Sequence, residues 1–244
     1  IVGEGMDAPG ARYKDGQKTI NSGQVTTFSN YTIVSENRLV KKPKGLPFDQ
    51  AVLFGCALPT GAGLVLNEIK PKQDHSVVVI GLGGIGMASV IALNALGVRK
   101  IIAIDTNRKK LELARYFGAS DAIHPQDSPV KDQCFKLLPD GADFCVESAG
   151  SVATIEMGFS LINPQKGELV FASHPPEGDQ IKLSPHELIT GKKIYGSWGG
   201  GVKPDRDVPR IYNMLANADI HLEPLISKSY QLEDINAALR DLEE

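Results

Sequence analysis

The feature that most constrains this chain is a glycine-rich turn that directly follows a strand-like run. Residues 76–80 (SVVVI) are mostly β-branched and apolar, which is typical of a parallel strand covered on both faces. The next six residues, GLGGIG (81–86), fit the pattern G-x-G-x-x-G, and residues 87–96 have the composition of a helix that ends at Gly97. This order of strand, turn and helix predicts a βαβ unit.

The turn also predicts a dinucleotide site. A second strand-like run, KIIAID (100–105), ends on an acidic residue, Asp105, 19 residues after the last glycine of the turn. An acidic residue that binds the ribose is expected about 20 residues after the turn. Asp105 would accept hydrogen bonds from the ribose hydroxyls and repel a 2′-phosphate, which favours NAD over NADP. Arg108 complicates this preference, because a nearby arginine can accommodate that phosphate.

Each glycine of the turn has its own expected role. Gly81 permits the tight turn, Gly83 lets the pyrophosphate approach the backbone, and Gly86 lets the helix pack closely on the strand. The helix N-terminus would then offer free N–H groups and the positive end of its dipole to the phosphates.

Strand-like and helical runs alternate along the rest of the chain, which predicts an α/β fold with a doubly wound parallel sheet. Residues 24–34 also have a strand pattern, whereas residues 1–22 are interpreted as loop and residues 41–45 as a turn. The expected strands of the sheet are 76–80, 100–105, 122–123, 142–150, 167–173 and 192–200, and the expected helices are 47–53, 87–96, 108–117, 131–138, 152–162, 208–216 and 231–242.

Composition excludes several other classes. The net charge of −3 gives no basis for a nucleic-acid partner. There is no run of eighteen apolar residues and no signal-peptide pattern at the start, so no membrane association is expected. The three cysteines are widely spaced and odd in number, which favours a reduced, cytoplasmic location over a disulfide framework.

The glycine turn alone leaves alternatives open. It could be a glycine-rich turn without a dinucleotide, or the cofactor loop of a methyltransferase, although the long segment before residue 81 disfavours the latter. A short-chain dehydrogenase is disfavoured, because no tyrosine in the chain is followed by lysine four residues later.

A second motif, FGCALPTGAG (54–63), lies upstream of the glycine turn. It resembles the G-C-x-x-x-T-G-x-G pattern of the zinc-containing medium-chain alcohol dehydrogenases. The similarity covers essentially the whole chain and is closest to the class that includes the glutathione-dependent formaldehyde dehydrogenases. Other matching segments are TFSNY (27–31), 78–86, DTN (105–107), ESAG (147–150), PP (175–176), 196–207 and VP (208–209).

The resemblance implies a Rossmann-type dinucleotide-binding domain over residues 58–198. Residues 1–57 and 199–244 would be remnants of one mostly β, GroES-like catalytic domain. The chain starts at Ile1 without a methionine and ends at Glu244 inside a predicted helix, which suggests a piece of a longer protein.

The resemblance also implies roles for particular residues. Cys56 matches a ligand of the catalytic zinc, and Thr60 matches a residue that packs against the nicotinamide ring. The other matched positions are the pyrophosphate loop (Gly81, Leu82, Gly83, Gly84, Ile85 and Gly86), the adenosine ribose contacts (Asp105, Lys110, Ser148 and Ala149) and the carboxamide end of nicotinamide (Ala172, His174, Ser197 and Gly199).

Several of these residues also have ordinary structural interpretations. Lys110 could belong to a solvated helix face, and His174 could be a surface histidine. Cys134 and Cys145 lie on a predicted helix and a predicted strand and are expected in the core. The remaining histidines lack metal-like spacing with Cys56 and are expected at the surface or in the core: His75, His124, His186 and His221.

The intact protein is therefore expected to be an NAD- and zinc-dependent dehydrogenase that converts a primary alcohol to an aldehyde. Catalytic zinc takes three protein ligands, and the resemblance implies that the other two precede Ile1. These 244 residues alone are then expected to be inactive. The alternatives are a non-catalytic NAD-binding fragment and a zinc-free quinone-reductase relative, which Cys56 disfavours. The resemblance also implies a homodimer through residues near 190–200.

Overall fold

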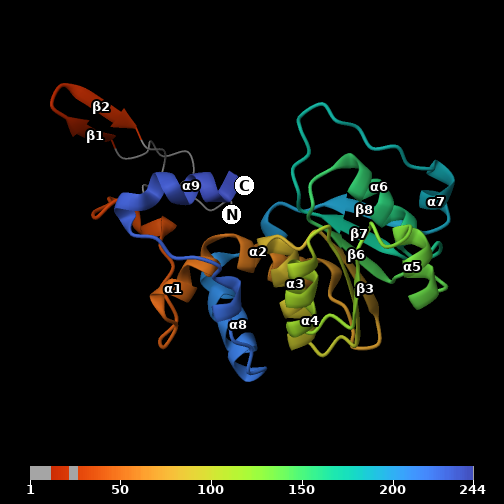
Figure 1. Ribbon diagram of the computed structural model, residues 1–244. Helices are drawn as coiled ribbons and strands as arrows, with labels where there is room; N and C mark the ends of the chain where they lie inside the picture. Colours follow the sequence, from red (N-terminus) through yellow and green to blue (C-terminus); the bar gives the residue numbers. More distant parts are fainter. Residues whose placement is uncertain (1–11, 22–26, 244) are drawn as a thin grey trace. The chain divides into compact units, whose positions relative to one another are not determined.

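The computed structural model describes residues 12–21 and 27–243, which form two compact units (Figure 1). The first unit covers Pro43–His221. The second contains the described residues of Val2–Lys42 and Leu222–Glu244. The domain boundaries predicted after residues 57 and 198 rest on the family resemblance, which assigns both flanking segments to a catalytic domain. These boundaries stay predictions.

A six-stranded parallel sheet forms the centre of the first unit, in the order β5-β4-β3-β6-β7-β8. The chain winds outward from β3 in one direction and then returns to β6 beside it, so the order reverses between these two strands. Ligands of open α/β sheets bind at such a point, beyond the carboxyl ends of the strands. The strands are β3 (Ser76–Ile80), β4 (Lys100–Ile104), β5 (Asp121–Ile123), β6 (Phe144–Glu147), β7 (Glu168–Phe171) and β8 (Lys193–Gly196).

Both faces of the sheet are covered, which explains why the central strands are apolar throughout. Successive side chains of a strand point to opposite faces. Val78 and Ile102 belong to the core cluster that includes residues of α5 (Val130–Leu137) and α6 (Val152–Leu161), and the alternate residues Val77 and Val79 are equally buried. The predicted α/β fold with a doubly wound parallel sheet is therefore confirmed.

The predicted helices of this unit are present. Helices α3 (Gly84–Ala95) and α8 (Pro204–Asn217) begin three and four residues before their predicted starts, and α7 (Pro185–Ile189) was not predicted. Asn107 caps α4 by accepting the N–H groups of Lys109 and Lys110. The helices are α1 (Phe48–Ala51), α2 (Ala57–Gly63), α3 (Gly84–Ala95), α4 (Arg108–Tyr116), α5 (Val130–Leu137), α6 (Val152–Leu161), α7 (Pro185–Ile189) and α8 (Pro204–Asn217), with 3-10 turns η2 (Val52–Gly55) and η4 (Gly199–Gly201).

Residues 57–69 form helix α2 and the π-helical turn η3 (Leu64–Ile69), which the sequence did not predict. Two glycines weaken the local helix signal in this segment. Packing compensates, because residues 58–65 are buried and a Cβ built on Gly61 would lie 2.1 Å from the carbonyl oxygen of Ile85 in α3. Tertiary contact at this close distance therefore overrides the weak propensity.

Over its described residues, the second unit contains a hairpin, three 3-10 turns and one helix. Strands β1 (Arg12–Asp15) and β2 (Lys18–Asn21) pair antiparallel around a two-residue loop. The turns are η1 (Glu36–Arg38), η5 (Glu223–Leu225) and η6 (Leu232–Asp234), and the helix is α9 (Ile235–Glu243).

Two predictions for this unit are wrong. The interpretation of residues 1–22 as loop fails over the hairpin, whose signal was Gly16 at the first position of its two-residue loop, with a φ of +57°; residues 1–11 and 22 lie outside the described residues. The strand expected over 24–34 does not form over the described part, 27–34; residues 24–26 lie outside the described residues. Phe28 and Tyr31 are exposed there, and β-propensity without a half-buried surface to pack on does not make a strand.

Among the described residues, no single helix has the length and apolar character to cross a membrane. The bent pair Phe48–Gly55 and Ala57–Ile69 meets that test only when its two helices are taken together.

Helix α8 begins with a buried carboxylate that predicts a pH dependence of stability. Asp207 is 1% exposed, accepts the N–H of Lys203 at 2.8 Å and pairs with Arg206 at 2.7 Å. Burial works against its ionisation, but the bonds from Arg206 and Lys203 and the charges of Arg206 and Arg210 outweigh burial and hold its pKa below the ordinary 3.8.

A carboxylate with a lowered folded-state pKa stabilises the fold above its unfolded-state pKa and loses that contribution as the pH falls through the folded-state value. Between about pH 5 and pH 7, we expect Asp207→Asn to have a lower free energy of unfolding than the unaltered protein. This difference should shrink below about pH 4. Urea unfolding of both proteins at each pH measures the difference. A deficit that stays constant down to about pH 2 would contradict the pKa argument.

Candidate dinucleotide site

The glycine turn lies where the strand order reverses, at the carboxyl end of β3. Gly81 has a φ of +82°, a conformation that suits glycine, and Gly83 is the N-cap of α3. A Cβ built on Gly86 would lie 1.8 Å from the carbonyl oxygen of Gly81, so the helix can pack against the turn only with glycine there. A Cβ on Gly83, by contrast, would meet no atom within 4 Å.

These two glycines show that the turn suits a pyrophosphate. Gly86 is required by the fold itself, whereas the open space at exposed Gly83 leaves room for a ligand against the backbone. The first N–H groups of a helix have no partners within the helix, so those of α3 are available to phosphate oxygens. The predicted loop residues Leu82, Gly84 and Ile85 lie in the same turn and first helical residues.

Asp105 follows β4 and connects two loops. Its Oδ2 accepts the N–H of Leu82 in the glycine turn at 2.6 Å, and its Oδ1 accepts the N–H of Asn107 at 2.7 Å. The carboxylate is thereby fixed next to the turn, as expected for a ribose-binding acid. Lys110 is exposed on the first turn of α4, and its contact with the ribose stays a prediction.

Ser148 and Ala149, which follow β6, pack directly on the glycine turn. The Ser148 hydroxyl donates to the carbonyl oxygen of Gly81 at 2.8 Å, and its backbone N–H donates to Ile80 at 2.9 Å. A Cβ on Gly81 would lie 2.6 Å from the backbone nitrogen of Ala149. The structure therefore brings the predicted pyrophosphate and ribose residues together at one edge of the sheet.

Glu147 is an organising residue to which sequence reasoning assigned no role. It is fully buried at the end of β6 and accepts the N–H groups of Ala149 and Gly150, each at 2.9 Å. It also accepts the hydroxyls of Thr154 at 2.8 Å and of Ser173. A buried carboxylate needs such partners, and these connect β6, α6 and the loop after β7. Its signal in the sequence was the acidic end of a buried strand, the same signal that identified Asp105.

The residues predicted at the carboxamide end follow β7 and β8. Ala172 is buried directly after β7, and Ser197 follows β8, its N–H donating to Phe171 at 2.8 Å. The exposed His174 packs edge-on against Trp198, with ring centroids 4.8 Å apart. Gly199 comes next, at the start of η4. These four predicted residues therefore follow neighbouring strands of the sheet, and Trp198 is an aromatic neighbour that sequence reasoning missed.

Thr60 lies in α2 and is 5% exposed. A Cβ on Gly200 would lie 2.3 Å from the Thr60 carbonyl oxygen, so this part of α2 packs on the segment that follows β8. The hydroxyl of Ser89 in α3 donates to Gly61 at 3.1 Å, which joins α2 to the helix after the glycine turn. Thr60 therefore contacts the segment predicted at the carboxamide end, on a helix that also packs on α3.

The described residues contain one of the ligands predicted for zinc, Cys56. Cys56 is an exposed free thiol at the N-cap of α2, and no group of three or more metal-ligating side chains occurs among the described residues. A catalytic zinc needs three protein ligands, so the described part of the chain does not form that site. Burial raises the pKa of Cys134 to about 11 and that of Cys145 well above its ordinary value, which agrees with their expected place in the core.

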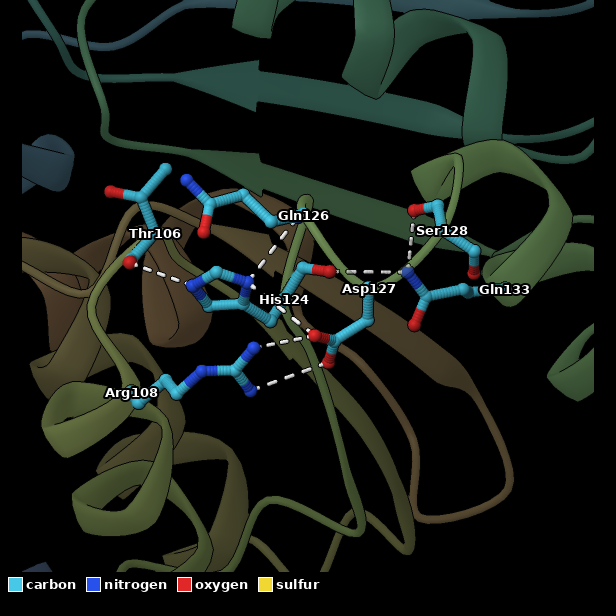
Figure 2. A network of polar contacts seen from close by, with 7 residues as sticks. All are labelled: Thr106, Arg108, His124, Gln126, Asp127, Ser128 and Gln133. Carbon is cyan, nitrogen blue, oxygen red and sulfur yellow. Dashed lines mark hydrogen bonds and ion pairs between the residues drawn. The ribbon is translucent and has the colours of Figure 1, made fainter.

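A polar network borders the loop that follows Asp105 (Figure 2). His124 follows β5 and is 4% exposed, with Nε2 2.9 Å from the carbonyl oxygen of Thr106. Arg108 forms a fork on Asp127, with nitrogen–oxygen distances of 2.5 and 3.4 Å. The hydrogen bond from Arg108 holds the pKa of Asp127 below its ordinary value. Thr106 directly follows Asp105, so this network contacts the candidate site.

A cavity of about 980 Å³ lies elsewhere, at the amino ends of the strands, where Ser76, Lys100 and Asp143 are among its lining residues. Charged groups there pair with one another, as in the 2.8 Å contact between Lys166 and Asp143. The glycine turn and both strand-end acids lie at the opposite edge, which is why we assign the site to the carboxyl ends.

Fold and site together define a class: an α/β protein that binds a dinucleotide at the switch point of a doubly wound sheet. The chain belongs to the zinc-binding dehydrogenase family, whose model matches residues 84–217. The resemblance found in the sequence is thereby confirmed.

Individual relatives agree with this family. The chain is 36% identical over 226 residues to an S-(hydroxymethyl)glutathione dehydrogenase of Escherichia coli, covering 92% of this chain and 61% of the relative. The benzyl alcohol dehydrogenase structure from Acinetobacter calcoaceticus matches with a TM-score of 0.84 at 26% identity, over 90% of this chain and 60% of that one. An alcohol dehydrogenase zinc-binding domain protein from Burkholderia ambifaria matches with a TM-score of 0.80 at 29% identity, over 86% and 56%. The chain thus spans about 60% of the length of its curated relatives.

The glycine turn gives a direct test of close packing. We expect Gly86→Ala to lower the free energy of unfolding by about 1–3 kcal/mol, the usual cost of forcing a methyl group into a packed site. Gly83→Ala is the matched control, because its Cβ enters open space, and it should change stability by less than about 1 kcal/mol. Urea unfolding measures both, and equal stabilities of the two variants would contradict the packing argument.

Proposed function

We propose that the intact protein is an NAD-dependent alcohol dehydrogenase of the zinc type, which oxidises a primary alcohol to an aldehyde. The observation that carries this proposal is the pairing of an open Gly83 with an anchored Asp105 at the switch point of the sheet. Membership in the zinc-binding dehydrogenase family supports the same class of reaction. Two of the matched proteins are named as dehydrogenases of S-(hydroxymethyl)glutathione and of benzyl alcohol.

Asp105 retains the capacity to bind the ribose. An ionised carboxylate has about four acceptor positions, and the N–H groups of Leu82 and Asn107 use two of them. The remaining positions can accept the 2′- and 3′-hydroxyls. The same charge repels a phosphate on the 2′-oxygen, so NAD is the proposed cofactor.

When bound, NAD supplies the acceptor for the hydride that leaves the alcohol carbon. The chain's own residues then have three tasks. Backbone N–H groups at the start of α3 hold the pyrophosphate, and Asp105 holds the adenosine ribose. At the other end, Thr60 and the segment from Ser197 to Gly199 orient the nicotinamide ring. The protein's contribution is to fix this ring at the distance and angle that hydride transfer requires.

We also propose Cys56 as one zinc ligand, in a site completed by residues other than those described. The Cys56 thiol is exposed and accessible to a metal ion, whereas Cys134 and Cys145 are buried. No catalytic step is assigned to the metal, because the described residues supply one ligand. The proposed cytoplasmic location rests on the same three free thiols, which a reducing compartment preserves.

A homodimer through residues near 190–200 is the proposed assembly. Strand β8 is the last strand of the sheet, and the exposed side chains of Ile189 and Trp198 lie on either side of it in the sequence. An edge strand of this kind offers backbone groups for pairing with its equivalent in a second copy. Sedimentation as a monomer at micromolar concentration would contradict this assembly.

Cofactor binding can be tested separately from stability. We expect the chain to bind NAD in a calorimetric titration, and Gly83→Ala to weaken that binding at least about tenfold, because the added methyl group occupies the space for the pyrophosphate. The stability of this variant should be nearly unchanged, since the space is open without ligand. Unchanged affinity for NAD would contradict the assignment of the turn to the pyrophosphate.

The zinc proposal has a distinct readout. In the intact protein, Cys56→Ser should reduce zinc content and zinc-dependent alcohol oxidation by at least about tenfold, because a hydroxyl is a poor zinc ligand. Affinity for NAD should stay within about twofold, since the cofactor contacts lie elsewhere. Cys134→Ser, at a buried thiol, is the control for a general loss of cysteine. Full zinc content in the Cys56 variant would contradict the ligand role.

A further inference from the structure

Arg108 presents a problem for cofactor selection. It is the first residue of α4 and lies three positions after Asp105, with its side chain 61% exposed. An arginine close to the ribose-binding acid can accommodate a 2′-phosphate and so admit NADP. Selection of NAD by Asp105 therefore depends on the direction in which the Arg108 side chain is held.

The structure holds Arg108 on another carboxylate. Its two terminal nitrogens contact the two oxygens of Asp127 at 2.5 and 3.4 Å, a bidentate arrangement. The fork pairs the guanidinium with the Asp127 carboxylate, engages two of its five N–H donors and directs the side chain toward Asp127. Figure 2 shows the pair beside His124, with the Arg108 side chain directed toward Asp127.

Asp127 is itself held by a turn that is anchored on both sides. Its backbone N–H donates to the His124 carbonyl at 3.1 Å. The buried His124 ring contacts the Thr106 carbonyl at 2.9 Å and accepts the Gln126 N–H at 3.3 Å. These contacts hold the His124 ring between the loop of Thr106 and the turn that carries Asp127.

The other side of the turn is anchored by Gln133 of α5. Its side-chain amide donates to the carbonyl oxygens of His124 at 3.2 Å and of Ser128 at 2.7 Å. The backbone of the turn that carries Asp127 is therefore anchored on both sides. An exposed ion pair is ordinarily worth only about 0.2–1 kcal/mol, but this anchoring lowers the cost of forming it.

We propose that Asp127 is a positioning residue for cofactor specificity: it holds Arg108 away from the ribose, so that the repulsion between Asp105 and a 2′-phosphate is not compensated. This inference rests on the proposed dinucleotide function and extends it to a residue outside the glycine turn. Asp127 does not contact the cofactor in this scheme. It acts through the direction of the Arg108 side chain.

The test is a calorimetric comparison of NAD and NADP binding at low salt, where charge effects are largest. We expect Asp127→Asn to tighten NADP binding about threefold to tenfold while the Kd for NAD changes by less than about twofold. The double variant Asp127→Asn with Arg108→Ala should return NADP to its original weak binding, because the freed guanidinium is then absent.

A matched control separates this effect from a change in net charge. Asp132→Asn removes an exposed carboxylate from the neighbouring α5 and should leave the ratio of the two Kd values unchanged. An equal gain in NADP binding with this control would overturn the proposal. So would unchanged NADP binding in Asp127→Asn, or tight NADP binding by the unaltered chain that Arg108→Ala abolishes. Binding of neither nucleotide by the unaltered chain would contradict the proposed function itself.

Discussion

The close approach between Gly86 and the carbonyl oxygen of Gly81 is the constraint on which the rest of the site depends. It draws the first turn of α3 onto the end of β3, at a distance that no side chain permits. The same Gly81 carbonyl accepts the Ser148 hydroxyl, and Ala149 packs against Gly81 from the end of β6. Because the two strands at the switch point are joined through this turn, the N–H groups at the start of α3 have a direction that is fixed by the fold.

Two acidic residues at strand ends extend this arrangement along the sheet. Asp105 accepts N–H groups from the glycine turn and from its own loop. Glu147 accepts N–H groups from two residues after β6, and hydroxyls from α6 and from the loop after β7. The difference between them is exposure. Glu147 is fully buried and saturated with protein donors, so it organises the edge, whereas Asp105 is partly exposed and keeps acceptor positions for a ligand.

Local sequence predicted the central sheet well, because buried parallel strands need continuous apolar runs such as 76–80 and 100–104. It failed for α2, where glycines obscure a helix that exists through packing on α3. The failure over 27–34 has the opposite cause, since β-branched and aromatic residues there find no buried surface to support a strand. Each error marks a place where tertiary contact, rather than propensity, decides the local structure.

The site residues also divide into those with a local sequence signal and those whose role depends on tertiary contacts. Gly81 to Gly86 and Asp105 could be predicted, because their spacing along the chain reflects the chemistry directly. The roles of Glu147 and Asp127 could not, since each depends on a partner far away in the sequence: Ser173 for the first and Arg108 for the second.

Cofactor binding and metal binding are separable in this protein for a geometric reason. The contacts around the glycine turn, Asp105 and Glu147 all lie within the unit Pro43–His221, so the dinucleotide surface is fixed by that unit's own packing. Zinc, in contrast, requires three ligands converging on one point, and Cys56 is the one matched ligand among the described residues. An effect on NAD affinity can therefore be traced to the turn and its supporting acids, and an effect on zinc to the thiol, without either measurement depending on turnover.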